Sequence, residues 1–429
     1  MKDLLPLLKT RIPGPQSRAL ARQLRRYESR NITYVSEHWP IFWKRAKGAN
    51  VWDVDGNRYI DLTAAFGVAS VGHGNRRVVA AVKAQAGELM HAMGDVHPNE
   101  LKLRLARELV GLTFGRWSKG ASAKRGSALH RSAATTSPGR VIFANSGAEA
   151  VEAALKTAAV HTKRTGVIAF EGAYHGLTYG ALDTTWRADF RTHFNKQLGH
   201  FTAHVPFGKL PNVAKIEEFG AVIVEPIQGR GGIVVPPDDF LPKLRAFCDQ
   251  HGLVLIFDEI YTGFCRTGKW FACEHWGVVP DIVCVGKAMA GGFPMSACIG
   301  RADVMDSWPE TNGEAIHTST FLGNPLGCAA ALAAIGEMKR MKLEGRSREL
   351  GDWLTKRLGN IGSVRGKGLM LGFEVGNAVP IVEKLLQRGI LALPEGDRGE
   401  ILGITPPLVI TEKQLDYCVD VVEELVREL

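Results

Sequence analysis

The sequence predicts an α/β protein with a large domain on a mainly parallel sheet and a smaller α/β domain built from both chain termini. From about residue 65 to residue 320, short apolar runs typical of buried strands alternate with stretches of helical character, which is the pattern of βαβ units. A chain of 429 residues is also long enough to bury a large core and to form two domains.

The predicted elements follow in order along the chain. Residues 13–50 indicate an arm with one helix, and residues 51–62, VWDVDGNRYIDL, indicate a hairpin around an Asp-Gly turn. The expected central strands are RVIFAN, GVIAFEG, GAVIVEP, LVLIFDE and DIVCVG. Residues 325–340 form an expected Ala-rich helix. The tail carries an expected strand, GLMLGFEV, and two expected helices, IVEKLLQRG and EKQLDYCVDVVEELVREL.

These elements suggest three segments. We expect residues 1–60 to form an arm and part of the small domain, residues 61–324 the large domain, and residues 325–429 the C-terminal small domain. Residues 116–139 are rich in Ser, Ala, Gly and Lys/Arg, a composition typical of a flexible loop. We expect an insertion there.

Charge and hydropathy argue against two classes of partner. The formal net charge of +9 is concentrated in residues 1–50 and 115–140. Because no recognition motif or interleaved aromatic pattern accompanies these basic segments, we expect no nucleic-acid partner. No apolar run approaches the roughly 20 residues that span a bilayer, so we expect no membrane partner.

The seven cysteines indicate a reducing compartment. They include no C-x-x-C pair and no His/Cys ligand spacing, and several lie in apolar strand or helix contexts. We therefore expect reduced thiols, no metal site and a cytoplasmic protein. The start of the chain, MKDLLPLLKTRIPGPQ, lacks the long apolar stretch of a secretory signal.

Lys287 is the most informative residue, because it directly follows an apolar strand and precedes Gly291 and Gly292. A poorly hydrated lysine has a lowered pKa and a nucleophilic amine. Taken alone, the pattern also fits a surface lysine at a strand end. Upstream, however, a second apolar strand ends at Asp258. A pyridoxal phosphate site needs both a lysine for the aldehyde and a carboxylate for the pyridine nitrogen, so these two are the expected catalytic residues.

Both residues lie within motifs that resemble a known family. DEIYTGFCRTGKW and PDIVCVGKAMAGGFP are similar to the signature of class III, or omega-type, pyridoxal-phosphate aminotransferases. The resemblance begins near VWDVDGNRYIDL, continues through FANSGAEAVEAALK, FEGAYHG, VEPIQGRGG and HTSTFLGNPLGCAAALA, and ends near ITPPLVIT. It implies the fold-type I architecture, pyridoxal 5'-phosphate as cofactor, and a homodimer or higher homo-oligomer whose subunits share active sites.

The resemblance also implies roles for individual residues. Tyr174 would stack on the cofactor ring opposite Ile260, and Asp258 would keep the ring nitrogen protonated. Glu225 would order the acid side of the site, and Thr320 would reach the phosphate bound by the neighbouring subunit. The expected cofactor-binding residues are Ser146, Gly147, Ala148, Tyr174, His175, Glu225, Asp258, Ile260, Tyr261, Lys287 and Thr320.

Some of these assignments have alternatives. Residues 146–148 lie between a strand and a helix, where backbone amides and a hydroxyl can cradle a phosphate. N-capping by Ser146, with Glu149 as the capping-box partner, explains the same pattern. Tyr174 could instead be a core aromatic. Tyr261 stands where the family commonly has glutamine, which leaves its contact with the cofactor's phenolic oxygen open.

The substrate side departs from the family. Leu177 stands where members acting on ornithine-like or γ-amino-acid substrates have an arginine, and Gly403 replaces a carboxylate-binding arginine before PPL. The glutamate that pairs with that second arginine in a QGEGG-like motif is replaced by Arg230. We expect Arg230 to bind a substrate carboxylate; the alternative is an arginine directed to solvent or to a neighbouring acid. Phe66 should make the pocket more apolar.

The expected function is ping-pong transfer of an amino group from an amine or amino acid to a keto acid or aldehyde. Lys287 would hold the cofactor as a Schiff base and then shuttle the proton between the substrate α-carbon and the cofactor. Two alternatives remain open. One is an aminomutase or amino-acid racemase of the same family, and the other is a non-catalytic pyridoxal-phosphate-binding regulatory protein.

Overall fold

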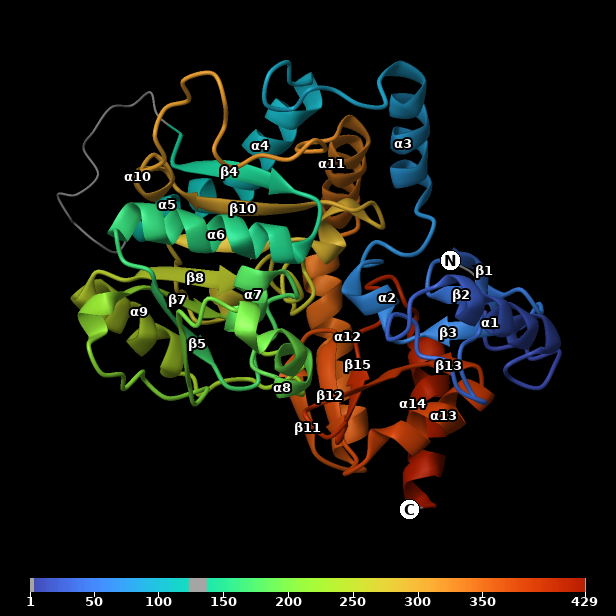
Figure 1. Ribbon diagram of the computed structural model, residues 1–429. Coiled ribbons are helices and arrows are strands. Elements are labelled where there is room, and N and C mark those ends of the chain that lie inside the picture. Colours follow the sequence, from blue (N-terminus) through green and yellow to red (C-terminus); the bar gives the residue numbers. More distant parts are fainter. Residues whose placement is uncertain (1–3, 123–136, 429) are drawn as a thin grey trace.

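The computed structural model describes residues 4–122 and 137–428, which form three sheets surrounded by helices (Figure 1). The largest sheet has seven strands in the order β4-β10-β9-β8-β7-β5-β6. All neighbours in it pair in parallel except at β10, which is antiparallel to β4 and β9. The prediction of a mainly parallel sheet is confirmed. Its strands are β4 (Gly139–Ala144), β5 (Gly166–Phe170), β6 (Thr202–Val205), β7 (Phe219–Val224), β8 (Val254–Asp258), β9 (Ile282–Val285) and β10 (Ser296–Arg301).

The central strands are apolar throughout because both of their faces are covered. Along β8, Val254 and Ile256 pack in a cluster with α6 (Gly147–Thr162), whereas Leu255 and Phe257 pack in a second cluster with α9 (Phe240–His251). Every residue of β8 is buried. The sheet is therefore the middle layer of the large unit, and all five strands predicted from apolar runs are present.

Further helices surround this sheet. The Ala-rich helix α11 (Pro325–Arg340), predicted from the sequence, packs against α3 (Arg76–Glu88) and α4 (Glu100–Leu112). Helix α11, at the start of the expected C-terminal domain, therefore packs on helices of the expected large domain. The expected domain boundaries stay a prediction. The remaining short helices are α7 (Tyr179–Thr184), α8 (Ala188–Arg191) and α10 (Ala302–Met305).

The two ends of the chain meet in a second sheet. The predicted hairpin is confirmed as β2 (Asn50–Asp53) and β3 (Arg58–Asp61), which pair antiparallel next to β1 (Trp43–Lys47). The short strand β13 (Ile390–Leu391) pairs in parallel with β3. Figure 1 shows the blue N-terminal strands beside the red C-terminal helices. The predicted first helix is α1 (Pro15–Tyr27), and α2 (Ala64–Gly67) follows β3.

A third sheet belongs to the C-terminal part and has the order β11-β12-β15-β14. The predicted strand, now β12, and the two predicted helices of the tail are present, whereas α12 and the three other strands of this sheet were not predicted. The elements are α12 (Leu343–Gly359), β11 (Val364–Lys367), β12 (Met370–Glu374), α13 (Ala378–Gln387), β14 (Leu393–Glu395), β15 (Ile401–Ile404) and α14 (Glu412–Arg427).

The expected flexible insertion at residues 116–139 is wrong for its first part. Helix α5 (Phe114–Ser122) continues into it, and β4 begins at its end. Trp117 holds the helix, since its ring packs edge-on against Phe114 and Phe271 and its indole N–H donates to Glu274 at 3.0 Å. The basic composition concealed this buried aromatic anchor. The rest of the expected insertion, residues 123–136, lies outside the described residues.

All seven cysteines are buried and free, as expected for reduced thiols. Within residues 4–122 and 137–428, no helix is both long enough and apolar enough to cross a membrane.

Candidate active site

The expected catalytic residues follow strands that end at one edge of the large sheet. The carboxyl ends of β5, β7, β8 and β9 meet there, and β4 runs the same way because β10 pairs antiparallel with both β4 and β9. Asp258 ends β8, and Lys287 comes two residues after the adjacent strand β9. Ligands of open α/β sheets bind at this edge.

A cavity of about 660 Å³ opens at this edge. Its wall contains every residue that the sequence predicts for the cofactor and the substrate, with the exception of Thr320, which is exposed elsewhere on the chain. The lining residues are Phe66, Ser146, Gly147, Ala148, Tyr174, His175, Gly176, Leu177, Thr178, Glu225, Arg230, Asp258, Ile260, Tyr261, Lys287 and Glu395.

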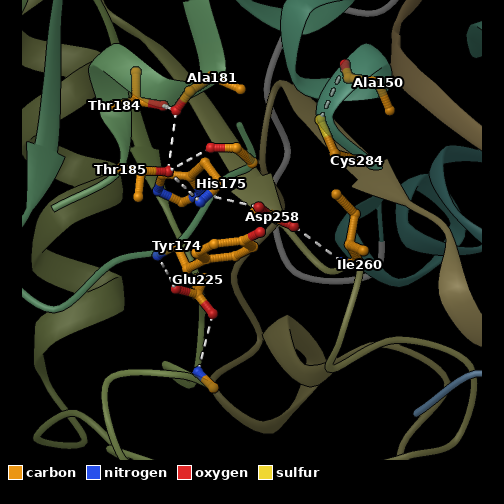
Figure 2. A network of polar contacts seen from close by, with 12 residues as sticks. Ala150, Tyr174, His175, Ala181, Thr184, Thr185, Glu225, Asp258, Ile260 and Cys284 are labelled. Carbon is orange, nitrogen blue, oxygen red and sulfur yellow. Dashed lines mark hydrogen bonds and ion pairs between the residues drawn. The ribbon is translucent and has the colours of Figure 1, made fainter. Parts of the chain in front are cut away.

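Asp258 is held by two hydrogen bonds (Figure 2). One carboxylate oxygen lies 2.8 Å from Nδ1 of His175, and the other accepts the backbone N–H of Ile260 at 3.1 Å. The His175 ring is buried, and its own backbone N–H donates to the Thr185 hydroxyl at 3.0 Å. His175 thus donates a hydrogen bond from its Nδ1–H to the Asp258 carboxylate and fixes the orientation of that carboxylate.

Glu225 follows β7 and joins two segments of the cavity wall. Its carboxylate accepts the backbone N–H groups of Tyr174 and Gly229, each at 2.9 Å. Burial raises the pKa of Glu225, while His175 and these hydrogen bonds oppose that rise. Figure 2 shows the hydrogen bond between Glu225 and the Tyr174 backbone, so Glu225 fixes the backbone that presents the Tyr174 ring.

Lys287 lies in a strained backbone conformation at the start of a short 3-10 helix, Lys287–Ala290. Its φ of 40° is in the left-handed region, which a side chain with a Cβ rarely adopts. Its amine lies 4.5 Å from the centre of the Tyr261 ring. Burial lowers the pKa of Lys287, and the carboxylates of Asp258 and Glu225 oppose this shift. The lysine is therefore directed into an enclosed site.

Ser146 caps helix α6, because its hydroxyl accepts the backbone N–H of Glu149 at 3.3 Å. The Glu149 carboxylate accepts the N–H of Asn145 and not that of Ser146, so the expected capping box is only half present. The same N-terminus also lines the cavity, and a Cβ on Gly147 would lie 2.9 Å from the Ile260 side chain. Capping and phosphate binding are therefore compatible here.

Arg230 lies in the cavity wall against two aromatic rings. Its guanidinium carbon is 5.2 Å from the centre of the Tyr174 ring and 5.7 Å from that of Phe190. Among the described residues, its buried Nε has no hydrogen-bond partner. Such stacking holds a guanidinium in place while leaving its planar edge available for a carboxylate.

Tyr261 fits into a slot that two glycines create. A Cβ on Gly67 or on Gly229 would lie 2.6 or 2.5 Å from its ring. Its hydroxyl donates to the Thr405 hydroxyl at 3.0 Å. The expected contact with the cofactor's phenolic oxygen stays a prediction, and the observed hydrogen bond ties the ring to the C-terminal part instead.

The outer wall is apolar. Phe66 and Leu177 are 60% and 51% exposed, and both line the cavity. Phe66 has a φ of 61°, so the turn after β3 presents it in a left-handed conformation. The expectation that Phe66 lies at the pocket fits this position, and its contact with substrate stays a prediction.

Glu395 lines the cavity but was not among the expected site residues. It ends β14, which belongs to none of the motifs that resemble the family. One signal was present in the sequence. Gly403 lies on the neighbouring strand β15, and a Cβ there would lie 2.9 Å from Glu395 Cγ. A missing side chain at residue 403 thus leaves room for the side chain of Glu395.

The site suits the cofactor that the sequence suggested. A half-buried lysine, a fixed carboxylate on the next strand, a flat aromatic ring and a helix N-terminus all meet in one cavity. These are the groups that an aldehyde, a pyridine nitrogen, a ring face and a phosphate require.

Residues 33–426 match the family model described as aminotransferase class-III. An acetylornithine aminotransferase of Methanosarcina mazei is 39% identical over 92% of this chain and 94% of that protein. A leucine/methionine racemase of Thermococcus litoralis is 34% identical over 93% and 92%. A solved ornithine aminotransferase of Toxoplasma gondii, with partial occupancy of pyridoxal phosphate at its active site, superposes with a TM-score of 0.81 at 32% identity, covering 96% and 95% of the two chains.

Fold and site together define a fold-type I pyridoxal-phosphate enzyme, so the predicted fold class is confirmed. The chain belongs to the class III aminotransferases. It is a pyridoxal-phosphate-dependent aminotransferase, and it uses an amine donor and a keto-acid acceptor. The sequence prediction of family, cofactor and enzyme class is confirmed.

Proposed function

We propose that this aminotransferase carries out both half-reactions in the cavity at the sheet edge, with Lys287 and Asp258 as its catalytic residues. The observation that carries the proposal is the pair itself. Asp258 and Lys287 follow adjacent parallel strands and line one cavity, and each is fixed by its own backbone position or hydrogen bonds.

The residues of the chain divide the chemistry between them. Bound pyridoxal phosphate would supply the electron sink for the substrate carbanion. Asp258, fixed by His175, places a negative charge where a ring nitrogen must stay protonated. Lys287 would hold the aldehyde, and its amine, when free, would move the proton at the substrate α-carbon. The lowered pKa of Lys287 favours the neutral amine that both tasks require.

The phosphate and the ring are assigned to two further segments. Residues 146–148 at the N-terminus of α6 would bind the phosphate, and Tyr174 would cover one ring face with Ile260 on the other. Support comes from their shared place in the cavity wall. The helix N-terminus would then bind the phosphate of the cofactor, while Tyr174 and Ile260 would contact the two faces of its ring.

Arg230 is the proposed anchor for the carboxylate of the keto acid. Its stacking on Tyr174 and Phe190 holds the guanidinium beside the catalytic cavity. A bidentate pair with a carboxylate would also satisfy hydrogen-bond capacity that the described residues leave unused at this side chain.

Thr320 would act in a second subunit. It lies outside the cavity of its own chain, and the loop that carries it is fixed by the hydrogen bond from Thr318 to Asp95 at 2.8 Å. A homodimer or a higher homo-oligomer with shared active sites would bring Thr320 to the phosphate of its neighbour. Seven buried, free thiols support a cytoplasmic location for this assembly.

A spectroscopic half-reaction tests the proposed function. The holoenzyme is mixed with an amine donor in the absence of any acceptor, and the visible absorbance of the bound aldehyde is followed. We expect the absorbance to disappear with the donor and to return after a keto acid is added. An enzyme that keeps its absorbance with every donor would contradict the proposal.

Racemisation is a second candidate, because one relative is a leucine/methionine racemase. The same residues could move a proton on and off an α-carbon without net amine exchange. A chiral assay of a single amino-acid enantiomer without any keto acid distinguishes the two activities, since only a racemase converts that enantiomer into a racemic mixture under that condition.

A further inference from the structure

Glu395 is a carboxylate in the active-site cavity that the proposed mechanism does not use. No described residue donates a hydrogen bond to its side chain, and it forms no ion pair within the described part of the chain. Burial raises the pKa of Glu395 to about 7, although Arg230 and Lys287 oppose the rise. A cationic ligand would stabilise the charged form of Glu395, because no described cationic side chain of the cavity is in contact with it.

The structure keeps Glu395 in the cavity by a local device. Gly403 faces it from β15, and a Cβ at that position would lie 2.9 Å from Glu395 Cγ. The backbone N–H of the next residue, Gly396, donates to the carbonyl of Arg230 at 3.1 Å. The end of β14 and the loop after β7 are therefore tied together, and this contact keeps Glu395 and Arg230 in the same cavity.

The charged and titratable groups around Glu395 come from several elements. Arg230 follows β7, Lys287 follows β9, and Arg187, which donates to the Gly396 carbonyl at 2.7 Å, precedes α8. Glu225 adds a like charge. Tyr261 also faces the acid.

We propose that Glu395 binds a second ammonium group of the amine donor, so that the enzyme prefers diamines or other dibasic amines over monoamines of the same length. This inference rests on the proposed function. Glu395 and Arg230 then serve opposite half-reactions: the acid binds the distal cation of the donor, and the arginine binds the carboxylate of the acceptor. One cavity can thereby bind two substrates of opposite charge in turn.

The test compares diaminopentane with pentylamine as donors in single-turnover half-reactions of the holoenzyme. For the native protein we expect the specificity for the diamine to exceed that for the monoamine about tenfold to hundredfold, the range of a charged hydrogen bond. Glu395→Gln should abolish most of this ratio and change the pentylamine rate little. Gly403→Ala, which crowds Glu395, should lower the ratio as well.

The pH dependence supplies a test without any substitution. The distal ammonium stays protonated well above neutral pH, whereas Glu395 gains its charge as the pH rises through about 7. The diamine-to-monoamine ratio should therefore rise through that range in the native enzyme and stay flat in Glu395→Gln. Taking the ratio cancels the ionisation of the reacting amine, which both donors share.

Glu423→Gln is the matched control. Glu423 lies on α14 and pairs with Arg427, outside the lining of the cavity, so the ratio should stay at the native value. A native ratio near one, or equal losses with both donors in Glu395→Gln, overturns the inference and leaves the aminotransferase function intact. If neither donor nor any amino acid removes the visible absorbance, the proposed function fails and the inference fails with it.

Discussion

The cavity has two halves that are built differently. The sheet-edge half consists of Asp258, Lys287, His175 and Glu225, which follow strands of the large sheet and are fixed by buried hydrogen bonds or by a strained backbone. The loop half consists of Arg230, Glu395 and Phe66, which come from loops and from the end of β14. Its two charged groups have no polar side-chain partner among the described residues. Rigid elements position the chemistry, and the loop half is free to select the substrate.

The largest effect should come from Lys287→Ala in the sheet-edge half. Without the amine, the protein cannot bond the aldehyde carbon or move the substrate proton, so visible absorbance from lysine-bound cofactor and transamination should both be lost. Absorbance spectra and steady-state assays measure the two effects. Lys367→Ala, at a lysine on β11 outside the cavity, is the control and should be unaffected. A Lys287→Ala protein with native spectrum and turnover would show that another lysine carries the reaction.

Asp258→Asn should separate binding from catalysis. An amide keeps the size of the side chain but removes the negative charge that holds the ring nitrogen protonated. Loss of such a preorganised charge costs on the order of a hundredfold or more in rate. We expect the cofactor absorbance to remain detectable while the single-turnover rate falls. A rate within about twofold of the native value, far from that expectation, would refute the role of Asp258.

Arg230→Ala should weaken the binding of the keto acid and affect the amine donor much less, which separates the role of the loop half from that of the sheet-edge half. The apparent KM for the keto acid should rise about tenfold to hundredfold, which corresponds to the loss of about 1.5–3 kcal/mol from a charged hydrogen bond. The apparent KM for an uncharged amine donor should change much less. Arg187→Ala is the control, because Arg187 is close to Phe190 but pairs with Asp397 outside the cavity lining. Equal losses for both substrates, or none for either, would place the carboxylate elsewhere.

The smallest effect should come from the hydrogen bond that ties Tyr261, in the cavity wall, to Thr405 in the C-terminal part. Tyr261→Phe and Thr405→Val each remove one partner and should each lower the free energy of unfolding, and a typical net hydrogen bond contributes about 0.5–1.5 kcal/mol. Denaturant unfolding of both single variants and the double variant measures the coupling. Because the bond can be lost only once, the double variant should be more stable than the sum of the single losses predicts; strictly additive losses would mean that the bond contributes nothing.

The contrast between the halves also explains how far the sequence could be interpreted. Buried parallel strands require continuous apolar runs, so β8 and β9 and the residues after them, Asp258 and Lys287, stand out in the chain. The edge strand β6 and the short strands of the C-terminal part carry weak patterns and were missed. The start of the expected loop is helical because the tertiary contacts of Trp117 outweigh the local composition.

Glu395 shows why the substrate side was harder. Its place depends on a pairing between β14 and β15 and on the space that Gly403 leaves, and neither is visible in a local pattern. The sequence did reveal that Gly403 and Arg230 depart from related enzymes. Only the assembled sheet shows that an acid takes up the space beside that glycine.

Transfer of a labelled amino group tests the central claim most directly. The native holoenzyme is given an amine donor with isotopically labelled nitrogen together with an unlabelled keto acid, and the products are examined by mass spectrometry. The account predicts that the label appears in the amino acid formed from the keto acid, in equal amount to the carbonyl compound formed from the donor. Label that stays in the donor, or that is released as ammonia, would contradict it.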